Sequence, residues 1–177
     1  HSLRRRQRQM CIRDRIKAAD IVIESFPLYF FGMPSQMKAT TDRCLPFMLP
    51  YMGNLVEDKN ASFHELRDES MHEKRLVVIT TCGYVDEKPM YPALLKQLDL
   101  IAGEGHYTAI LCPEGELFIA DKAKRQREGY LAEITRAGAE FAQNRALSEE
   151  TKKRIAKPIL SPKGFETITL AHWEMNK

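Results

Sequence analysis

The sequence lacks any long hydrophobic run. No apolar stretch approaches the roughly 20 residues of a membrane-spanning helix, although hydrophobic residues make up 44% of the 177-residue chain. The pattern of a secretory signal peptide is also missing. We therefore expect a cytoplasmic protein without a membrane partner, and the hydrophobic content is sufficient for the core of a single domain.

Close cysteine spacing is absent as well. The chain has four cysteines, and no two of them form a C-x-x-C pair. Cys44, Cys82 and Cys112 are widely separated, which is typical of reduced cytosolic thiols rather than of a disulfide framework or an iron-sulfur motif. His64 and His72 are not spaced as metal ligands either. We expect no metal site.

The net excess of positive charge comes from the first residues. Residues 5–15, RRQRQMCIRDR, resemble the in-frame translation of a transposon-end adapter used in preparing sequencing libraries, so we predict that residues 1–15 are a non-native leader. Residues 1–15 hold six Arg and one Asp, and without them the formal net charge falls from +3 to −2. A basic arm for RNA or an anionic membrane is the alternative, but interleaved aromatic residues for stacking on bases are missing. We expect no nucleic-acid partner.

A short apolar strand leads into a turn rich in proline, glycine and aromatic residues. Ile21, Val22 and Ile23 are all β-branched, and the run is too short for a helix, which predicts a strand covered on both faces. The turn over residues 27–33 follows, and Pro34 begins a helix. Because ligands of open α/β sheets bind beyond the carboxyl ends of the strands, we expect this turn to line a binding site.

The rest of the chain alternates between strand and helix patterns, which is typical of a parallel sheet covered by helices. A polar, irregular insertion is expected over residues 53–74, and Ser148 is expected to cap a short helix. Strands are predicted over residues 76–81 and 106–112, and helices over residues 34–45, 91–101 and 122–144.

The strand and turn resemble those of the NADPH-dependent FMN reductase family of flavodoxin-like proteins. A second matching element is RLVVITTCG at residues 75–83, a strand that ends in a small polar turn before Tyr84. The resemblance covers residues 16–144. It implies an α/β fold, a flavodoxin-like three-layer sandwich with a parallel sheet, that binds FMN and takes hydride from NAD(P)H. The residues that match in the first element are Ala19-Asp20, Pro27, Tyr29, Gly32, Met33-Pro34, Gln36, Lys38 and Asp42-Arg43.

The first two strands of that fold and its phosphate loop have no counterpart in the sequence. Flavodoxin-like sheets have the strand order 2-1-3-4-5, and the strands found here correspond to the third, fourth and fifth. We therefore expect an N-terminally truncated FMN-binding domain over residues 16–145 and a C-terminal helical extension over residues 146–177. The third strand then becomes an exposed apolar edge, and the truncation is expected to weaken or abolish FMN binding.

The resemblance implies that the flavin ring lies between two walls, and no catalytic residue is expected because the flavin itself exchanges hydride. For Leu28 and Phe30, a place in the hydrophobic core is a strong alternative to a role in binding. Tyr29, at the end of the strand, and Gly32, which allows a ligand to approach the backbone closely, favour ligand binding. Cys82 is a candidate redox thiol, but the sequence shows neither a base that would activate it nor a resolving partner. The first wall consists of Pro27, Leu28, Tyr29, Phe30, Gly32 and Met33, and the second wall of Thr81, Cys82, Gly83 and Tyr84.

The leading function is an FMN-dependent NAD(P)H oxidoreductase that reduces a small-molecule electron acceptor, a flavin, quinone, nitro or azo compound, and acts as a homodimer. The alternatives are a flavodoxin-type electron carrier and a non-catalytic flavodoxin-like interaction module. The polar insertion and the long C-terminal tail favour the reductase, because a minimal carrier needs neither. The tail over residues 158–177, with Phe165 and Trp173, either contacts a partner subunit or lies over the substrate site.

Overall fold

The centre of the protein is a parallel sheet, seen in a computed structural model that describes residues 2–49, 65–86 and 88–175. Its three strands have the order β1-β2-β3. Parallel pairing places Pro27 beside Thr81, and Thr81 beside Cys112, so all three strands end at one edge. The parallel α/β sheet predicted from the sequence is confirmed. The strands are β1 (Ile21–Pro27), β2 (Arg75–Thr81) and β3 (Tyr107–Cys112).

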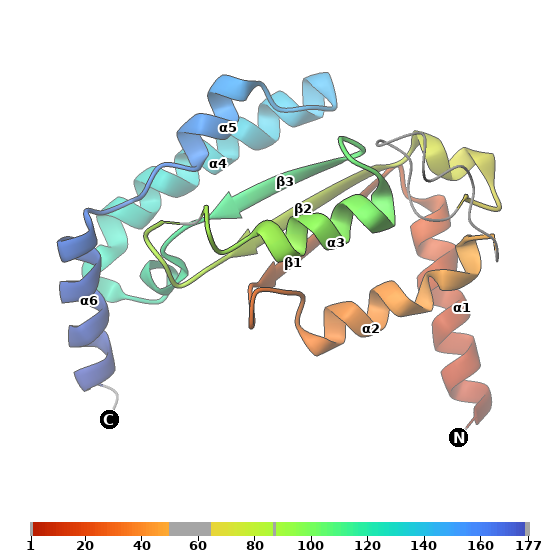
Figure 1. Cartoon of the computed structure of the whole chain (residues 1–177), viewed down its shortest axis with the longest axis horizontal. Helices are drawn as coiled ribbons and strands as arrows, with labels where there is room; N and C mark the ends of the chain where they lie inside the picture. The colour runs from red at the N-terminus through yellow and green to blue at the C-terminus, as the bar shows by residue number, and fades with distance from the viewer. Residues whose placement is uncertain (1, 50–64, 87, 176–177) are drawn as a thin grey trace.

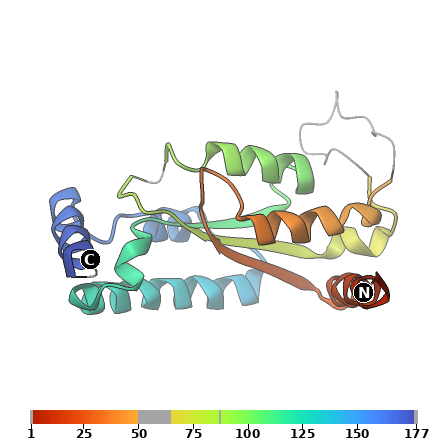
Figure 2. The same cartoon turned by 90° about the horizontal axis from the view of Figure 1, so that it is seen from below.

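Helices cover both faces of the sheet, which makes three layers (Figure 1, Figure 2). One face carries α2 (Ser35–Arg43) and α3 (Pro92–Ala102), and the other carries α4 (Lys124–Asn144) and α5 (Glu149–Ile155). α1 (Ser2–Ala18) and α6 (Pro162–Met175) lie at opposite ends of the molecule (Figure 1), with α6 beyond the carboxyl ends of the strands. Short 3-10 helices connect these elements: η1 (Leu45–Phe47), η2 (Glu69–Glu73), η3 (Gly115–Phe118) and η4 (Asp121–Ala123).

Alternate residues of β2 enter two separate hydrophobic clusters. Val77 packs with Ile110 of β3 and Tyr130 of α4, whereas Val78 is fully buried with Leu94 of α3 on the opposite face. Burial on both faces explains why the sequence of β2 is a nearly continuous apolar run rather than an alternating one.

β1 is an edge strand, and among the described residues it pairs with β2 alone. Ile21 packs partly against the cluster around Val77, but Ile23 is 62% exposed. The prediction that this run is covered on both faces is therefore wrong for Ile23, because α4 and α5 pack over β2 and β3 instead. The result is the exposed apolar edge that was expected, which is open to pairing with another strand.

Helix boundaries follow local sequence signals. Pro92 occupies the first turn of α3, and Gly103, with φ of 90°, ends that helix. Ser148 caps α5 as predicted, since its hydroxyl accepts a hydrogen bond from Thr151 N at 3.3 Å. Pro34 is the N-cap of α2 rather than its first helical residue, because its ψ of 154° is still extended.

α1 runs without a break past residue 15, the predicted end of the leader. Its carboxyl end is tied to the rest of the protein. Lys17 Nζ lies 3.3 Å from Asp68 Oδ2, and Lys74 Nζ donates to the carbonyl oxygens of Lys17 and Ala19 at 2.6 and 2.8 Å. These contacts involve residues beyond 15, so the leader over residues 1–15 stays a prediction.

The polar insertion is only partly within the described residues. Residues 53–64, including His64, lie outside them, and the remainder contains η2, where His72 is exposed. In the described ranges, no three His, Cys, Asp or Glu side chains gather as a metal site would need. None of the described helices combines the length and apolar character that a membrane crossing requires.

Candidate functional site

The two walls proposed from the sequence leave the sheet side by side. Leu28 N donates to Thr81 O at 2.8 Å, and Cys82 N donates to Cys112 O at 3.1 Å, so the hydrogen-bond ladder continues one residue past each strand. The structure therefore brings both walls to the same edge of the sheet. Their role in binding a ligand stays a prediction.

The first wall folds into a two-residue hairpin turn just after the exposed Pro27. Tyr29 N donates to Gly32 O at 3.2 Å and Gly32 N donates to Tyr29 O at 3.0 Å, while Phe30 and Phe31 between them have φ of 47° and 63°. Positive φ at both central residues defines a type I′ turn, which usually carries Asn-Gly. A left-handed conformation costs a bulky residue about 1–2 kcal/mol, and strain of this kind clusters at functional sites.

The turn separates core residues from surface residues. Leu28 and Met33 pack against the buried cluster around Phe26, as the core alternative for Leu28 predicted. Phe30 is 101% exposed and Tyr29 is 61% exposed. The core alternative for Phe30 is wrong, because a side chain at the tip of this turn extends away from the sheet.

The second wall is anchored in the core beneath it. Cys82 is buried, and its carbonyl oxygen accepts a hydrogen bond from Gly115 N at 2.7 Å. The Tyr91 hydroxyl lies 3.2 Å from Thr80 O and 3.3 Å from Cys112 O, and burial raises the pKa of this phenol. The Cys82 thiol and amide thus face the protein, so Cys82 supports the wall from below.

Both walls present backbone donors to the outside. Gly83 and Tyr84 are exposed, and Thr81 is half-buried. The amides of Gly83 and Tyr84, like those of Phe30 and Phe31, have no acceptor among the described residues. Exposed aromatic rings next to unpaired N–H groups suit a flat ligand with a polar edge.

A third element of the site comes from η3 and α6, and the sequence analysis missed it. A Cβ on Gly115 would lie 3.1 Å from Thr81 Cβ, so any larger residue here would have to displace the second wall by a few tenths of an ångström. Glu116 Oε1 lies 3.5 Å from where a Cβ on Gly83 would be, and Glu116 Oε2 accepts a hydrogen bond from Trp173 Nε1 at 3.3 Å. No local pattern connects residues so far apart in the chain, although Gly115 itself was recognisable as a turn residue.

The C-terminal tail is held at this edge by a buried carboxylate. Glu114 accepts hydrogen bonds from the backbone N–H groups of Ile159 and Leu160, the latter at 3.1 Å. Burial raises the pKa of Glu114, although these two hydrogen bonds act in the opposite direction. Phe165 of α6 packs against Leu117 of η3. The tail therefore lies next to the second wall, and both roles left open for it, contact with a partner subunit and a position over the substrate site, stay predictions.

A parallel sheet with helices on both faces and a turn-lined carboxyl edge defines an open α/β protein, in which ligands bind at that edge. A family model described as flavodoxin-like fold matches residues 6–109, which is more than half of the chain. The protein therefore belongs to the family with the flavodoxin-like fold. The match begins inside the predicted leader and ends within β3.

Two solved structures show a distant likeness. An FMN-dependent NADH-azoreductase from Bacillus anthracis str. Ames Ancestor, in complex with FMN, has 16% sequence identity and a TM-score of 0.45 over 64% of this chain and 53% of that one. A proposed quinone reductase from Klebsiella pneumoniae has 23% identity and a TM-score of 0.38 over 59% of this chain and 42% of that one. The chain thus spans about half the length of these proteins. A comparison with curated proteins gave no match.

Proposed function

We propose that the chain is part of an FMN-dependent NAD(P)H oxidoreductase that reduces a small-molecule electron acceptor, a flavin, quinone, nitro or azo compound. The family with the flavodoxin-like fold and the reductase-like residues of the first wall support this function. The observation that carries it is the pair of adjacent exposed turns, at Phe30 and at Gly83, with unpaired amides on both. We further propose a cytoplasmic homodimer.

The exposed residues fit the ring of FMN. The aromatic faces of Tyr29, Phe30 and Tyr84 offer stacking surfaces, and the amides of Phe31 and Gly83 are available to carbonyl and nitrogen atoms of the ring. Bound FMN would supply hydride and electron transfer between the nicotinamide donor and the acceptor. The part of the protein is then to hold the ring flat at the carboxyl edge, with the donors fixed by the anchored second wall.

The direct test is an FMN titration of the 177-residue chain, followed by quenching of flavin fluorescence and then by NADPH and NADH oxidation. Binding with a single dissociation constant, accompanied by oxidation of either donor, would support the proposal. Absence of quenching at all flavin concentrations would overturn it for this chain.

A variant pair locates the flavin on the protein. Phe30→Ala removes a ring that is fully exposed, so the core is unchanged, and we expect about tenfold weaker FMN binding because stacking on one aromatic ring is worth about 1–3 kcal/mol. Leu131→Ala removes another exposed apolar side chain, from α4 on the far side of the sheet, and should leave affinity unchanged. Equal affinities of the two variants would show that the flavin does not contact the first wall.

A further inference from the structure

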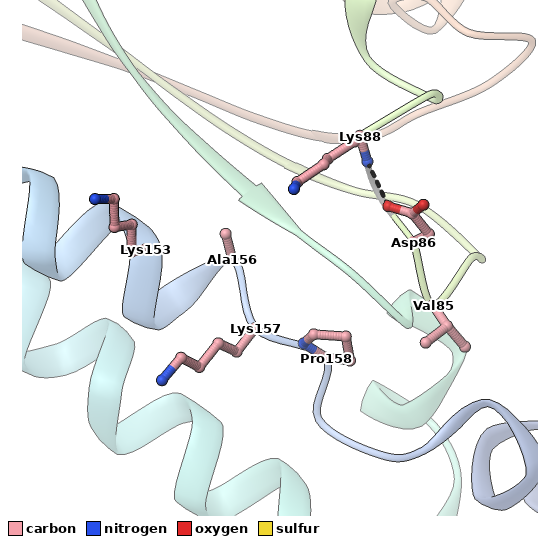
Figure 3. Close-up of a pocket in the computed structure, with 7 residues that line it drawn as sticks. All are labelled: Val85, Asp86, Lys88, Lys153, Ala156, Lys157 and Pro158. Atoms are coloured by element: carbon pink, nitrogen blue, oxygen red, sulfur yellow. Dashed lines mark hydrogen bonds between the residues drawn. The ribbon is translucent and has the colours of Figure 1, made fainter.

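The C-terminal tail and the second wall lie next to each other. Val85, which directly follows the second wall, and Pro158, which precedes the anchored backbone of the tail, line the same pocket (Figure 3). Further along the chain, Phe165 and Ile168 of α6 pack against the buried cluster around Leu117 of η3. Contacts at two places therefore hold α6 beside the second wall, beyond the carboxyl ends of the strands (Figure 1).

The element η3 connects α6 to the second wall through Glu116. Glu114, the residue before η3, donates its backbone N–H to Tyr84 O at 2.9 Å, so the start of η3 lies along this wall. Glu116 Oε1 lies 3.5 Å from the position that a Cβ on Gly83 would take. Because Gly83 has no side chain, the carboxylate of Glu116 lies directly against the backbone of the wall.

The second oxygen of this carboxylate holds the indole of Trp173. Trp173 Nε1 donates to Glu116 Oε2 at 3.3 Å, which satisfies the single polar atom of the indole. The side chain nevertheless remains 59% exposed, and Tyr84, the neighbour of Gly83, is 54% exposed. A tryptophan whose N–H is bonded while its ring faces solvent offers a flat apolar surface to a ligand.

The apolar surface at this place includes a third side chain. Ile119 is 66% exposed, and its backbone N–H donates to Glu116 O at 3.2 Å. Tyr84, Ile119 and Trp173 are thus each linked to Glu116 or to the wall residue that Glu116 contacts. Exposed apolar side chains that gather in this way are typical of a binding surface, whereas single exposed ones are common on any protein.

We propose that Trp173 and Tyr84 bind the electron acceptor, and that this acceptor is a planar aromatic molecule without a charged substituent. The side chains that contact it are flat and apolar, which suits stacking on an uncharged ring. Glu116 is a positioning residue, because it acts through the indole N–H. The inference rests on the proposed function, since it assigns the second ligand of the same site, and it narrows the proposed acceptors to uncharged quinone, nitro and azo compounds.

Trp173 is the single tryptophan of the 177-residue chain, so tryptophan fluorescence reports on this position alone. The probe is 2,3-dimethyl-1,4-naphthoquinone, whose quinone ring has no free position for addition of a thiol. It is titrated without NAD(P)H, both with and without saturating FMN. We expect saturable quenching with an unchanged fluorescence lifetime, which indicates a complex. Quenching that shortens the lifetime and does not saturate in either condition would overturn the proposal, because it indicates random collisions with an exposed ring.

Isothermal titration of variants locates the quinone on the protein. Trp173→Ala removes an exposed ring, and we expect about tenfold weaker binding of the quinone. Leu170→Ala removes another exposed apolar side chain of α6 and should leave the affinity unchanged. Equal affinities of these two variants would overturn the proposal. Equally tight binding of the non-aromatic 1,4-cyclohexanedione to the unmodified protein would overturn the aromatic class of the ligand.

Two variants of Glu116 test its positioning role. Glu116→Ala removes the acceptor of the indole N–H, and we expect about threefold weaker binding of the quinone. Glu116→Gln keeps an oxygen that accepts this hydrogen bond, so it should restore the affinity of the unmodified protein. If Glu116→Gln binds the quinone as weakly as Glu116→Ala, the positioning role is wrong.

An FMN titration of the same proteins separates this inference from the proposed function. If FMN binds, while quinone binding does not depend on Trp173, the inference fails and the oxidoreductase proposal stands. If FMN does not bind, while quinone binding depends on Trp173, the oxidoreductase proposal fails. The surface of Trp173 and Tyr84 then stands as a site for a planar aromatic ligand.

Discussion

The two walls at the carboxyl edge differ in how the sheet supports them. The second wall leaves the central strand β2, and buried contacts from Tyr91 and Cys82 fix it from below. The first wall leaves the edge strand β1, and its tip carries Phe30 in full contact with solvent. A wall that follows a central strand is supported by residues packed on both faces of the sheet. A wall that follows an edge strand is less constrained and more exposed to solvent.

This difference suits the proposed binding of a flat flavin ring by the two walls. Backbone N–H donors need a fixed position. When the loop that carries an N–H group is mobile, the conformational entropy lost on ordering it offsets most of the free energy gained from the hydrogen bond. An aromatic ring that closes on a ligand needs access instead. The strained turn at Phe30 and Phe31 shows that the exposed wall is maintained at some cost to stability.

The largest expected effect comes from releasing the tail that supports the second wall. Glu114→Ala leaves the N–H groups of Ile159 and Leu160 without their buried acceptor, and we expect a loss of about 2–3 kcal/mol in the free energy of unfolding. Urea unfolding measures it. Glu116→Ala is the control, because Glu116 is only partly buried and bonds the exposed Trp173, and it should cost about 0.5 kcal/mol. Equal losses would show that Glu114 does not anchor the tail.

A smaller effect is expected from the hydroxyl beneath the second wall. Tyr91→Phe removes the donor shared by Thr80 O and Cys112 O and should destabilise the protein by about 1 kcal/mol. Hydrogen exchange of the Cys82 amide should also accelerate, because Cys82 N donates to the same Cys112 carbonyl. Tyr107→Phe, which removes a bond to Asp99 Oδ1 at 2.8 Å, is the matched change away from the wall, and exchange at Cys82 should not respond to it.

The first wall should respond in the opposite direction. Replacing the turn by Phe30→Asn and Phe31→Gly supplies residues that tolerate positive φ, and we expect a gain of about 1 kcal/mol in stability. The same double variant should bind FMN more weakly, since the exposed ring is gone. Unfolding and FMN titration on one sample measure both effects. If the double variant were less stable than the parent, the turn would not be strained.

The sequence predicted the features that depend on local pattern. Strands over residues 76–81 and 106–112 follow from apolar runs, and the parallel arrangement follows from their alternation with helices. The exposed edge of β1 was predicted, but the uncovered face at Ile23 was not, because an isolated β-branched run reads the same on an edge strand as in the centre of a sheet. The buried bonds of Glu114 and the approach of Trp173 to Glu116 could not be predicted, since they join residues about 45–57 positions apart with no periodic signal.

The smallest effect concerns Glu24, whose carboxylate lies half-buried on β1. Burial raises its pKa, so the folded protein holds this proton more tightly than the unfolded chain does. The stabilising contribution of the protonated form is complete below the ordinary pKa of a glutamate and is lost as pH rises through the raised folded value. Glu24→Gln stays neutral throughout, and its stability relative to the parent should therefore increase as pH rises above the ordinary pKa of a glutamate.

Glu149→Gln provides a control of opposite sign, measured by urea unfolding at the same series of pH values. The hydrogen bond and charge of Lys152 lower the pKa of Glu149, so its contribution is present above the ordinary pKa and disappears in acid. This variant should lose stability relative to the parent as pH rises. If the stability of Glu24→Gln and that of the parent changed with pH in the same way, Glu24 would be solvated. The face of β1 toward α2 would then be as exposed as the opposite face is at Ile23.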